Sequence, residues 1–250
     1  MKSIILAAGY ATRLYPLTKD FPKPLLKVGD SSILDRLIND VDAFDEIDEH
    51  IIISNHRFIS HFEQWKACTH LSKKVTILDD GSTENENRLG AVKDIAYAIN
   101  TLALDDDILV LAGDNLLDFS LKPFITYFEK KNTTCIMRHY ESEKSRLQKT
   151  GVAIIDGDDK VIQMQEKPVE PASNWAVPPF YLYQKETLPL IVDAVKKSVC
   201  NTDAPGDFIA WFCTQRPVHA WEMAGKRYDI GDLRSYEEAQ IYAKTFSNFL

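Results

Sequence analysis

The sequence predicts an α/β fold with a doubly wound, mostly parallel, Rossmann-like sheet, in a single domain with two lobes. Short and nearly continuous apolar runs are typical of strands that are buried on both faces of a parallel sheet. Between these runs lie segments whose apolar residues recur at helical spacing. No Pro-, Gly- or Ser-rich linker interrupts the 250 residues. We therefore expect one domain over residues 1–250, with lobes at about 1–113 and 114–250.

The first half of the chain alternates strands with helices. Strands are expected at residues 2–8, 50–55, 74–79 and 107–114, and helices at 32–44, 57–68 and 90–102. In sheets of this kind the ligand lies beyond the carboxyl ends of the strands.

The second half is less regular. Strands are expected at residues 133–140, 151–156, 161–168 and 175–183, and helices at 185–197 and 233–246, with a short helix that Asp207 opens. Aromatic residues gather at 175–183 and 208–212, and core packing is the expected role for most of them.

Composition limits the classes of partner. The chain has 29 basic and 37 acidic residues, a formal net charge of -8, so we expect it to bind neither nucleic acid nor a membrane through a general basic surface. No apolar run reaches the roughly 20 residues that a membrane helix needs. The four cysteines show no metal-ligand spacing, and no signal-peptide pattern opens the chain, so a reducing cytoplasm is expected. The oligomeric state stays open, a homo-oligomer included.

The first loop combines small residues with fixed charge. Ala7, Ala8, Gly9 and Ala11 follow the first strand, so backbone N–H groups can point at an anion, and the Arg13 guanidinium suits phosphate oxygens. The alternative is that the small residues only let the loop pack on the sheet. The loop matches neither GxGxxG nor GxxxxGK[ST].

Two further charged residues are placed near strand ends. Lys23 lies between Pro22 and Pro24, which we expect to hold it in an extended, pre-set position. Asp114 follows the apolar strand of "LVLAGDN", where its carboxylate can hold Mg²⁺ against phosphates or cap the following turn.

Five motifs in order resemble those of the sugar-1-phosphate nucleotidyltransferases, the family that includes glucose-1-phosphate thymidylyltransferase. They are "LAAGYATRLYPLTKDFPKPLLKV", "NRLGAVKDI", "LVLAGDN", "EKP" and "YDIGDLRSYEEA", which span nearly the whole chain. The resemblance implies Mg²⁺-dependent transfer from an NTP, bound in the lobe at about 1–113, to a sugar 1-phosphate, bound in the lobe at 114–250. Pyrophosphate is the second product.

The resemblance also implies residue roles. Arg13 and the loop N–H groups hold the β- and γ-phosphates, Lys23 the α-phosphate and Lys167 the acceptor phosphate, while Asp114 and Asp229 carry Mg²⁺. The implied nucleotide site comprises Ala7, Ala8, Gly9, Ala11, Thr12, Arg13, Lys23, Asn85, Gly90 and Asp114. The implied acceptor site comprises Asn115, Gly151, Glu166 and Lys167, with Glu166 on the sugar hydroxyls.

Several alternatives stay open. Glu166 can also be a solvated charge, and Gly90 and Gly151 can be turn glycines. Base choice falls to the loop that holds Asp79, Asp80 and Asn85, which the sequence does not rank. Little sequence follows "SYEEA", so an appended regulatory or second catalytic domain is not expected.

Other functions are also considered. Pro178-Pro179 departs from the small residues expected before "FYLY", which leaves the sugar undefined. A cytidylyltransferase acting on phosphocholine or a similar phosphorylated alcohol is the alternative within the class, and a catalytically silent nucleotide-sugar-binding relative is the alternative outside it. A dinucleotide-binding oxidoreductase is disfavoured because the second strand ends in Asn55 rather than an acidic residue.

Overall fold

The computed structural model describes residues 1–246, so residues 247–250 of the predicted domain lie outside the described residues. Contacts divide the chain into two compact units. Unit 1 comprises residues 1–2, 89–111 and 122–223, and unit 2 comprises 3–88, 112–121 and 224–250. These units are discontinuous in sequence, unlike the predicted lobes at about 1–113 and 114–250. Which substrate each lobe binds stays a prediction.

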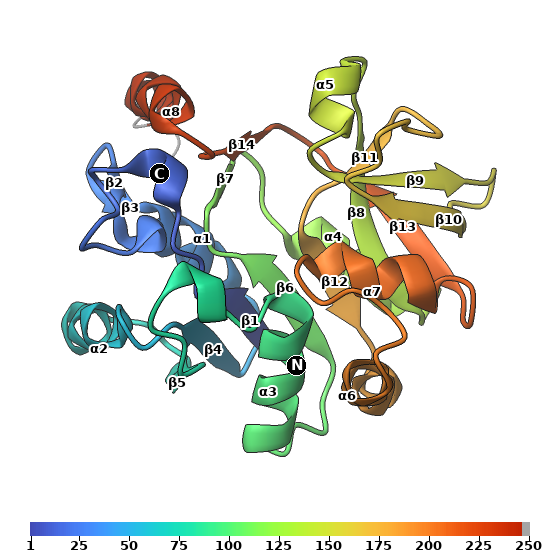
Figure 1. Ribbon diagram of the computed structural model, residues 1–250, viewed down its shortest axis with the longest axis horizontal. Coiled ribbons are helices and arrows are strands. Elements are labelled where there is room, and N and C mark those ends of the chain that lie inside the picture. The colour runs from blue at the N-terminus through green and yellow to red at the C-terminus, as the bar shows by residue number, and fades with distance from the viewer. Residues whose placement is uncertain (247–250) are drawn as a thin grey trace. The chain divides into compact units, whose positions relative to one another are not determined.

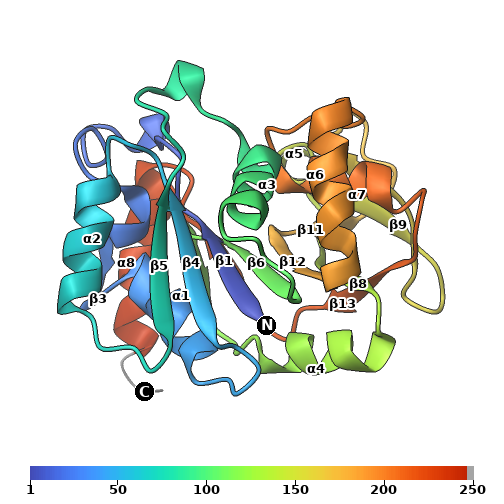
Figure 2. The ribbon, with the colours of Figure 1, turned by 90° about the horizontal axis from the view of Figure 1, so that it is seen from below.

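Unit 2 contains the expected alternation of strands and helices. Its elements are β1 (Lys2–Leu6), η1 (Thr12–Leu14), η2 (Lys23–Leu25), β2 (Lys27–Val28), β3 (Ser31–Ser32), α1 (Ile33–Asp42), β4 (Glu49–Ser54), α2 (Ile59–Cys68), β5 (Lys74–Asp79), η3 (Asn85–Asn87), β7 (Asn115–Leu117), β14 (Arg227–Asp229) and α8 (Leu233–Phe246). Strands β4 and β5 pair in parallel from Glu49 opposite Lys74 to Ser54 opposite Asp79. Figure 2 shows β1, β4 and β5 side by side. The α/β fold class is therefore confirmed.

Helix α1 shows how the local sequence sets an element boundary. Ser32 Oγ accepts a hydrogen bond from Asp35 N, and Asp35 Oδ2 accepts one from Ser32 N, both at 3.0 Å. This reciprocal capping satisfies two backbone donors at the helix start. Ile33, Leu37 and Val41 are buried along one side of the helix.

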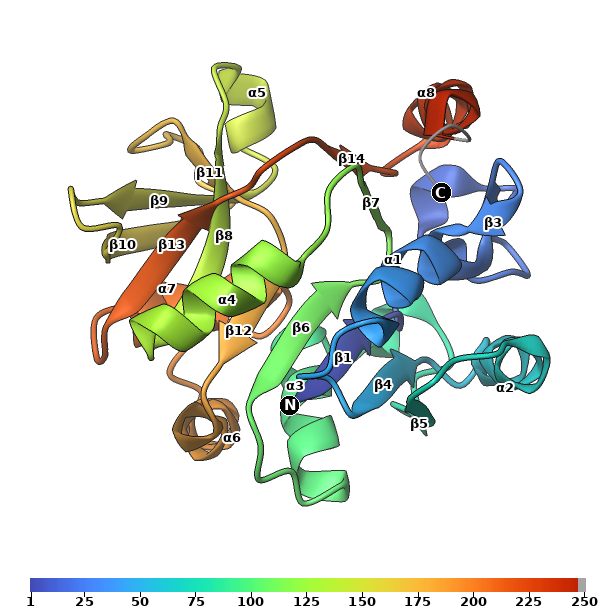
Figure 3. The same ribbon diagram turned by 180° about the vertical axis from the view of Figure 1, so that it is seen from behind.

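Unit 1 has the remaining strands in the order β10-β9-β11-β8-β12-β6, with β13 beside β8. Its elements are α3 (Ala91–Thr101), β6 (Ile108–Ala112), α4 (Lys122–Lys131), β8 (Thr134–Tyr140), α5 (Lys144–Leu147), β9 (Gly151–Ile155), β10 (Val161–Glu166), β11 (Trp175–Val177), β12 (Phe180–Tyr183), η4 (Lys185–Thr187), α6 (Leu188–Lys197), α7 (Pro205–Phe212) and β13 (Val218–Glu222). Strand β13 pairs with β8 in parallel, whereas β9, β10, β11 and β12 pair antiparallel. Helix α4, which the sequence analysis did not predict, packs on β8 and β13 (Figure 3).

The single strand expected at residues 175–183 is two strands. Strand β11 pairs with β8 and β9, and β12 pairs with β6 and β8. Pro178 and Pro179 separate them because proline has no N–H to donate to a ladder. Phe180 N then donates to Pro178 O at 2.8 Å, which closes a tight turn.

The aromatic residues pack in the core as expected. Tyr181, Tyr183 and Phe208 are at most 1% exposed, and the Phe208 and Phe212 rings stack at 5.1 Å. Among the helices within residues 1–246, none is long and apolar enough to cross a membrane.

Candidate active site

Two short strands of unit 2 pair next to Asp114, and one of them ends at Asp229. Strands β7 and β14 pair antiparallel with Asp229 opposite Asn115 (Figure 1). Ile230 N lies 3.5 Å from Asp114 O at the end of this ladder. Residues 114 and 229 are 115 positions apart in sequence, yet they are adjacent across the two strands. Asp114 and Asp229 are therefore near neighbours along the backbone of the two strands, and their sharing one Mg²⁺ stays a prediction.

Lys23 is the direct partner of Asp114. Its Nζ lies 2.7 Å from Asp114 Oδ2, with the lysine side chain 8% exposed and the aspartate side chain 38% exposed. Gly113 precedes Asp114 in a close turn, where a Cβ would lie 3.0 Å from Ile5 Cγ2 and 3.4 Å from Pro24 Cγ. The turn before Asp114 can therefore approach the proline that follows Lys23.

The predicted conformation of Lys23 is partly wrong. Lys23 is pre-set and buried, but it begins the 3₁₀ turn η2 rather than lying extended. Pro22 is extended, and the turn closes through Leu26 N, which donates to Lys23 O at 3.0 Å. The tight turn places Lys23, Pro24 and Leu25 in the protein interior.

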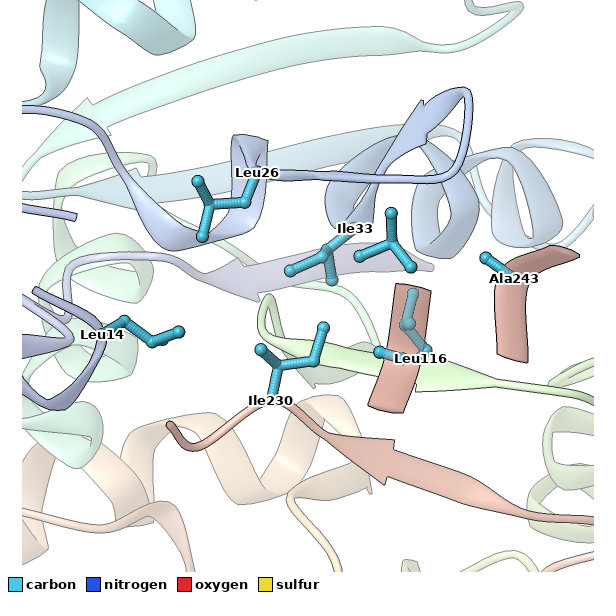
Figure 4. Close-up of a cluster of buried hydrophobic side chains, with 8 residues drawn as sticks. Leu14, Leu26, Ile33, Leu116, Ile230 and Ala243 are labelled. Carbon is cyan, nitrogen blue, oxygen red and sulfur yellow. The ribbon is translucent and has the colours of Figure 1, made fainter. Parts of the chain in front are cut away.

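A hydrophobic cluster in unit 2 contains residues that directly follow polar residues of the candidate site (Figure 4). Leu14, Leu26, Leu116 and Ile230 pack together in this cluster, and each is at most 8% exposed. Leu14 follows Arg13, Leu116 follows Asn115 and Ile230 follows Asp229. Burial of these apolar neighbours therefore anchors the backbone from which the polar side chains extend.

Arg13 lies against the backbone after β14. A Cβ on Gly231 would be 3.6 Å from Arg13 Nη2, which is ordinary contact. Arg13 is exposed. Hydrogen bonds from Ser235 lower the pKa of Asp232 most, and the charge of Arg13 lowers it further. No hydrogen bond or ion pair of Arg13 to another residue is found within residues 1–246. Its donors are thus available to an anionic ligand.

The sequence analysis missed Arg227. Its Nη1 donates to Asn115 Oδ1 at 2.6 Å and lies 3.8 Å from Asp229 Oδ2. Asn115 Nδ2 in turn donates to Asp114 Oδ1 at 2.7 Å. Lys23, Asp114, Asn115 and Arg227 therefore form one hydrogen-bonded chain. A basic residue two positions before Asp229, on the same face of a strand, was the available sequence signal.

The electrostatic setting keeps Asp114 ionised. Burial raises the pKa of the Asp114 carboxyl, but the charge and hydrogen bond of Lys23 and the charge of Arg227 outweigh burial and lower it. An ionised carboxylate is the form that binds a hard cation. Within residues 1–246 no group of three or more His, Cys, Asp or Glu residues could hold a metal ion. One or two carboxylates together with substrate phosphates are a ligand set that Mg²⁺ accepts, and Mg²⁺ binding here stays a prediction.

The first loop contains a residue with an unusual backbone conformation. Ala11 has a φ of 46° in the left-handed region, and its carbonyl accepts bonds from Leu14 N and Thr18 Oγ1. Asn55 Nδ2 donates to Ala8 O at 2.9 Å. The N–H groups of Gly9, Tyr10 and Ala11 have no acceptor in the part of the chain that the structure describes. The carbonyls of Ala8 and Ala11 are thus bound while these N–H groups are available.

The loop that holds Asp79, Asp80 and Asn85 is bonded internally. Asp79 accepts from His56 and Gly81 N, Asp80 accepts from Ser82, and Asn85 Oδ1 accepts from Arg88 at 2.9 Å. Gly90 has a φ of 92°, and a Cβ there would lie 2.5 Å from Thr202 O. Packing alone therefore requires glycine at position 90, and its role in nucleotide binding stays a prediction, as does that of Asn85.

The predicted acceptor residues of unit 1 gather at the end of β10. Glu166 is the last residue of β10 and lies opposite Gly151 in β9. Lys167 follows with a φ of 47°, and its N–H donates to Thr150 O at 3.1 Å. The strand therefore ends between Glu166 and Lys167. The pKa of Glu166 is raised to about 7, mainly by burial, whose effect the charge of Lys167 partly offsets.

Gly206 is a second residue that the sequence analysis missed. A Cβ at this position would lie 2.0 Å from Glu166 Oε2, and a Cβ on Gly151 would lie 3.3 Å from the same oxygen. Two glycines thus surround the Glu166 carboxyl group. The Pro-Gly pair at the start of α7 predicts a helix start and not this contact.

Comparison with known proteins agrees with the fold. The fold is similar to that of UDP-glucose pyrophosphorylase complexed with UDP-glucose, with a TM-score of 0.79, 19% identity and 98% of each chain covered. The nucleotidyl transferase family model matches residues 2–245. This chain therefore belongs to the nucleotidyl transferase family.

Individual relatives share about a quarter of the aligned residues with this chain. The bifunctional protein GlmU of Methanococcus aeolicus is 25% identical over 249 residues, which cover 94% of this chain and 54% of the relative. Glucose-1-phosphate adenylyltransferase of Fervidobacterium nodosum is 25% identical over 256 residues, 95% of this chain and 60% of the relative. This chain thus spans little more than half the length of these relatives.

Proposed function

We propose that this chain transfers a nucleotidyl group from an NTP to a sugar 1-phosphate, with Mg²⁺ as cofactor, to give an NDP-sugar and pyrophosphate. The observation that carries the proposal is the hydrogen-bonded chain of Lys23, Asp114, Asn115 and Arg227, with Asp229 beside it. Fixed cations alternate there with carboxylates, which suits a polyphosphate and its metal ion. The relatives named above and the family assignment support the same reaction class.

The reaction needs little proton transfer. A phosphate oxygen of the acceptor attacks the α-phosphorus of the NTP, a new P–O bond forms, and the bond to the β-phosphate oxygen breaks to release pyrophosphate. The attacking oxygen is already anionic at neutral pH. Catalysis then rests on positioning the phosphates and neutralising their charge.

The residues of unit 2 divide this work. Arg13 and the N–H groups of the first loop bind the β- and γ-phosphates, and Lys23 binds the α-phosphate. Asp114 and Asp229 would hold Mg²⁺, which when bound neutralises triphosphate charge. Arg227 orients Asn115 and balances the charge of Asp229, to which its Nη1 comes within 3.8 Å.

The residues of unit 1 favour a hydroxyl-bearing acceptor. Lys167 binds the acceptor phosphate, and Glu166 binds hydroxyl groups of the sugar. With a pKa of about 7, the Glu166 carboxyl is partly protonated at neutral pH, so it can both donate to and accept from hydroxyls. A fixed cation such as the choline group prefers an ionised partner. Glu166 therefore favours a sugar 1-phosphate over phosphocholine.

We also propose that the chain acts on small molecules in the cytoplasm. Its four cysteines are free thiols, as expected in a reducing compartment. Its net charge of -8 disfavours nucleic-acid binding.

A pyrophosphate-release screen tests the proposed function. Each of the common NTPs is paired with a panel of sugar 1-phosphates and with phosphocholine, with Mg²⁺ or with excess chelator. We expect release for at least one NTP and sugar 1-phosphate pair, and only with Mg²⁺. Release with phosphocholine alone, or release that chelator leaves unchanged, would contradict the proposal.

A further inference from the structure

Gly206 occupies an unfavourable position for a glycine. It is buried in the first turn of α7 and its φ is not positive, so its backbone conformation is open to any residue. Glycine within a helix is less favourable than alanine. Neither the helix nor the backbone conformation therefore explains this glycine.

The space beside Gly206 does explain it. A Cβ at position 206 would lie 2.0 Å from Glu166 Oε2 and 2.8 Å from Met164 Cε. Helix α7 packs on β10, the strand that carries both of these residues. Each clashing atom is the end of a flexible side chain. An added methyl group would therefore displace the Glu166 carboxyl group more readily than it would disrupt the backbone.

The surroundings of Glu166 depend on this close approach. Gly151 bounds the same oxygen on the β9 side. Burial raises the pKa of Glu166, and the charged groups that act on it are Lys167, which lowers it, and Asp207 and Asp203, which raise it. A carboxyl group displaced from between the two glycines would gain water and lose this shift.

We propose that Gly206 is a positioning residue for the acceptor: its missing side chain lets the first turn of α7 close on Glu166 and fixes where that carboxyl group lies. The inference rests on the proposed function only in assigning Glu166 to the acceptor site. The placement of the carboxyl group itself can be tested without turnover.

The experiment compares Gly206→Ala with Gly157→Ala, a control in the same unit where an added Cβ meets nothing within 4 Å. For both variants we measure KM for the acceptor and for the NTP, and follow the Glu166 carboxyl carbon by ¹³C NMR across pH. Gly206→Ala should raise the acceptor KM about tenfold or more, the effect of losing one good hydrogen bond to a charged group. The NTP KM should stay within about twofold.

The NMR titration gives the independent result. In Gly206→Ala the midpoint for Glu166 should fall from about 7 toward the ordinary 4.5, while Gly157→Ala should leave it unchanged. Glu166→Asp in the Gly206→Ala background shortens the side chain by one methylene, so it should restore part of the acceptor affinity. The same change in the wild type should weaken the acceptor.

Distinct outcomes would overturn the inference. They are a Gly206→Ala protein with wild-type titration and wild-type acceptor KM, an equal rise in both KM values, or an unfolded Gly206→Ala protein that Glu166→Asp does not rescue. If the wild type turns over no acceptor, the proposed function fails, and the titration still decides where Gly206 holds the carboxyl group.

Discussion

The two predicted metal carboxylates should differ in what they contribute to stability. Asp114 is the counterion of Lys23, whose side chain is only 8% exposed, at 2.7 Å. Asp229 is 53% exposed and lies 3.8 Å from Arg227. Asp114→Asn leaves a nearly buried ammonium group without its charged partner, whereas Asp229→Asn removes a weak surface attraction.

The magnitudes follow from burial. Removing one partner of a buried pair costs roughly 3–5 kcal/mol, but Asp114 is 38% exposed, so solvent screening reduces this to about 1–2 kcal/mol. At roughly 2–4 °C per kcal/mol for a protein of this size, Asp114→Asn should lower Tm by about 2–8 °C at pH 7. Asp229→Asn should change stability by less than about 0.5 kcal/mol.

The effect of pH checks the cause. The folded pKa of Asp114 is lowered, so the unfolded state binds more protons than the folded state at acid pH. Its contribution to stability is then fully present above the unfolded pKa of about 3.9 and is lost as pH falls through the folded pKa. The Tm difference between wild type and Asp114→Asn should therefore shrink below about pH 4.

Thermal unfolding of both variants, with turnover measured alongside, is the assay. Each variant should lose turnover by about 10²-fold or more, because each removes charge aimed at the triphosphate and its metal ion. An Asp114→Asn protein as stable as the wild type at pH 7 would refute the reasoning about Lys23. Wild-type turnover in either variant would show that the substituted aspartate does not belong to the active site.

Three further predictions concern the loop and the acceptor residues. Ala11 has a left-handed backbone conformation. Ala11→Gly should therefore change the free energy of unfolding by less than about 1 kcal/mol, because relief of backbone strain offsets the lost rigidity. Ala11→Val should weaken NTP binding in a folded protein, and calorimetric NTP affinity together with Tm checks both variants. Lys167→Ala should raise the acceptor KM by the equivalent of about 1.5–3 kcal/mol of binding free energy and leave the NTP KM unchanged. Equal rises of both KM values in steady-state kinetics would show that Lys167 does not belong to the acceptor pocket. The pKa of Glu166 is raised in the folded state, so the unfolded state binds fewer protons. Denaturant titrations should show Glu166→Gln gaining stability over the wild type as the pH rises from about 5 to 8. A difference in the free energy of unfolding that stays constant over this pH range would contradict this.

The sequence predicts the charged groups of the site better than it predicts their contacts. Lys23 and Asp114 are identified by their places near strand ends, but they are 91 positions apart. Their ion pair forms because the fold packs the turn at Gly113 against Ile5 and Pro24. Such a contact is a property of the packed fold, and no local pattern carries it.

Local signals explain the successes and one of the errors in the fold. The apolar runs at 50–55 and 74–79 are the parallel strands β4 and β5. The error at Pro178-Pro179 was avoidable, since paired prolines mark a break in a strand. Helix α4 and strand β13 were missed because the second half was assigned only at its clearest apolar runs.

Arg227 and Gly206 show what the motif approach leaves out. Arg227 lies just before a recognised motif, and its role appears only when β14 pairs with β7 and brings it to Asn115. Gly206 belongs to no motif at all. Its importance lies in the space beside it, which β10 and α7 create by packing together.

Transfer of label from an NTP carrying ³²P at the α-phosphate into an NDP-sugar measures the proposed nucleotidyl transfer itself. The wild type, Asp114→Asn and Lys23→Ala are each incubated with that NTP, a sugar 1-phosphate and Mg²⁺, and the products are separated. We expect label in an NDP-sugar for the wild type, an equal amount of unlabelled pyrophosphate, and a loss of about 10²-fold or more in both variants. Label that stays in the NTP with every sugar 1-phosphate, or that reaches the NDP-sugar at the wild-type rate in both variants, would contradict it.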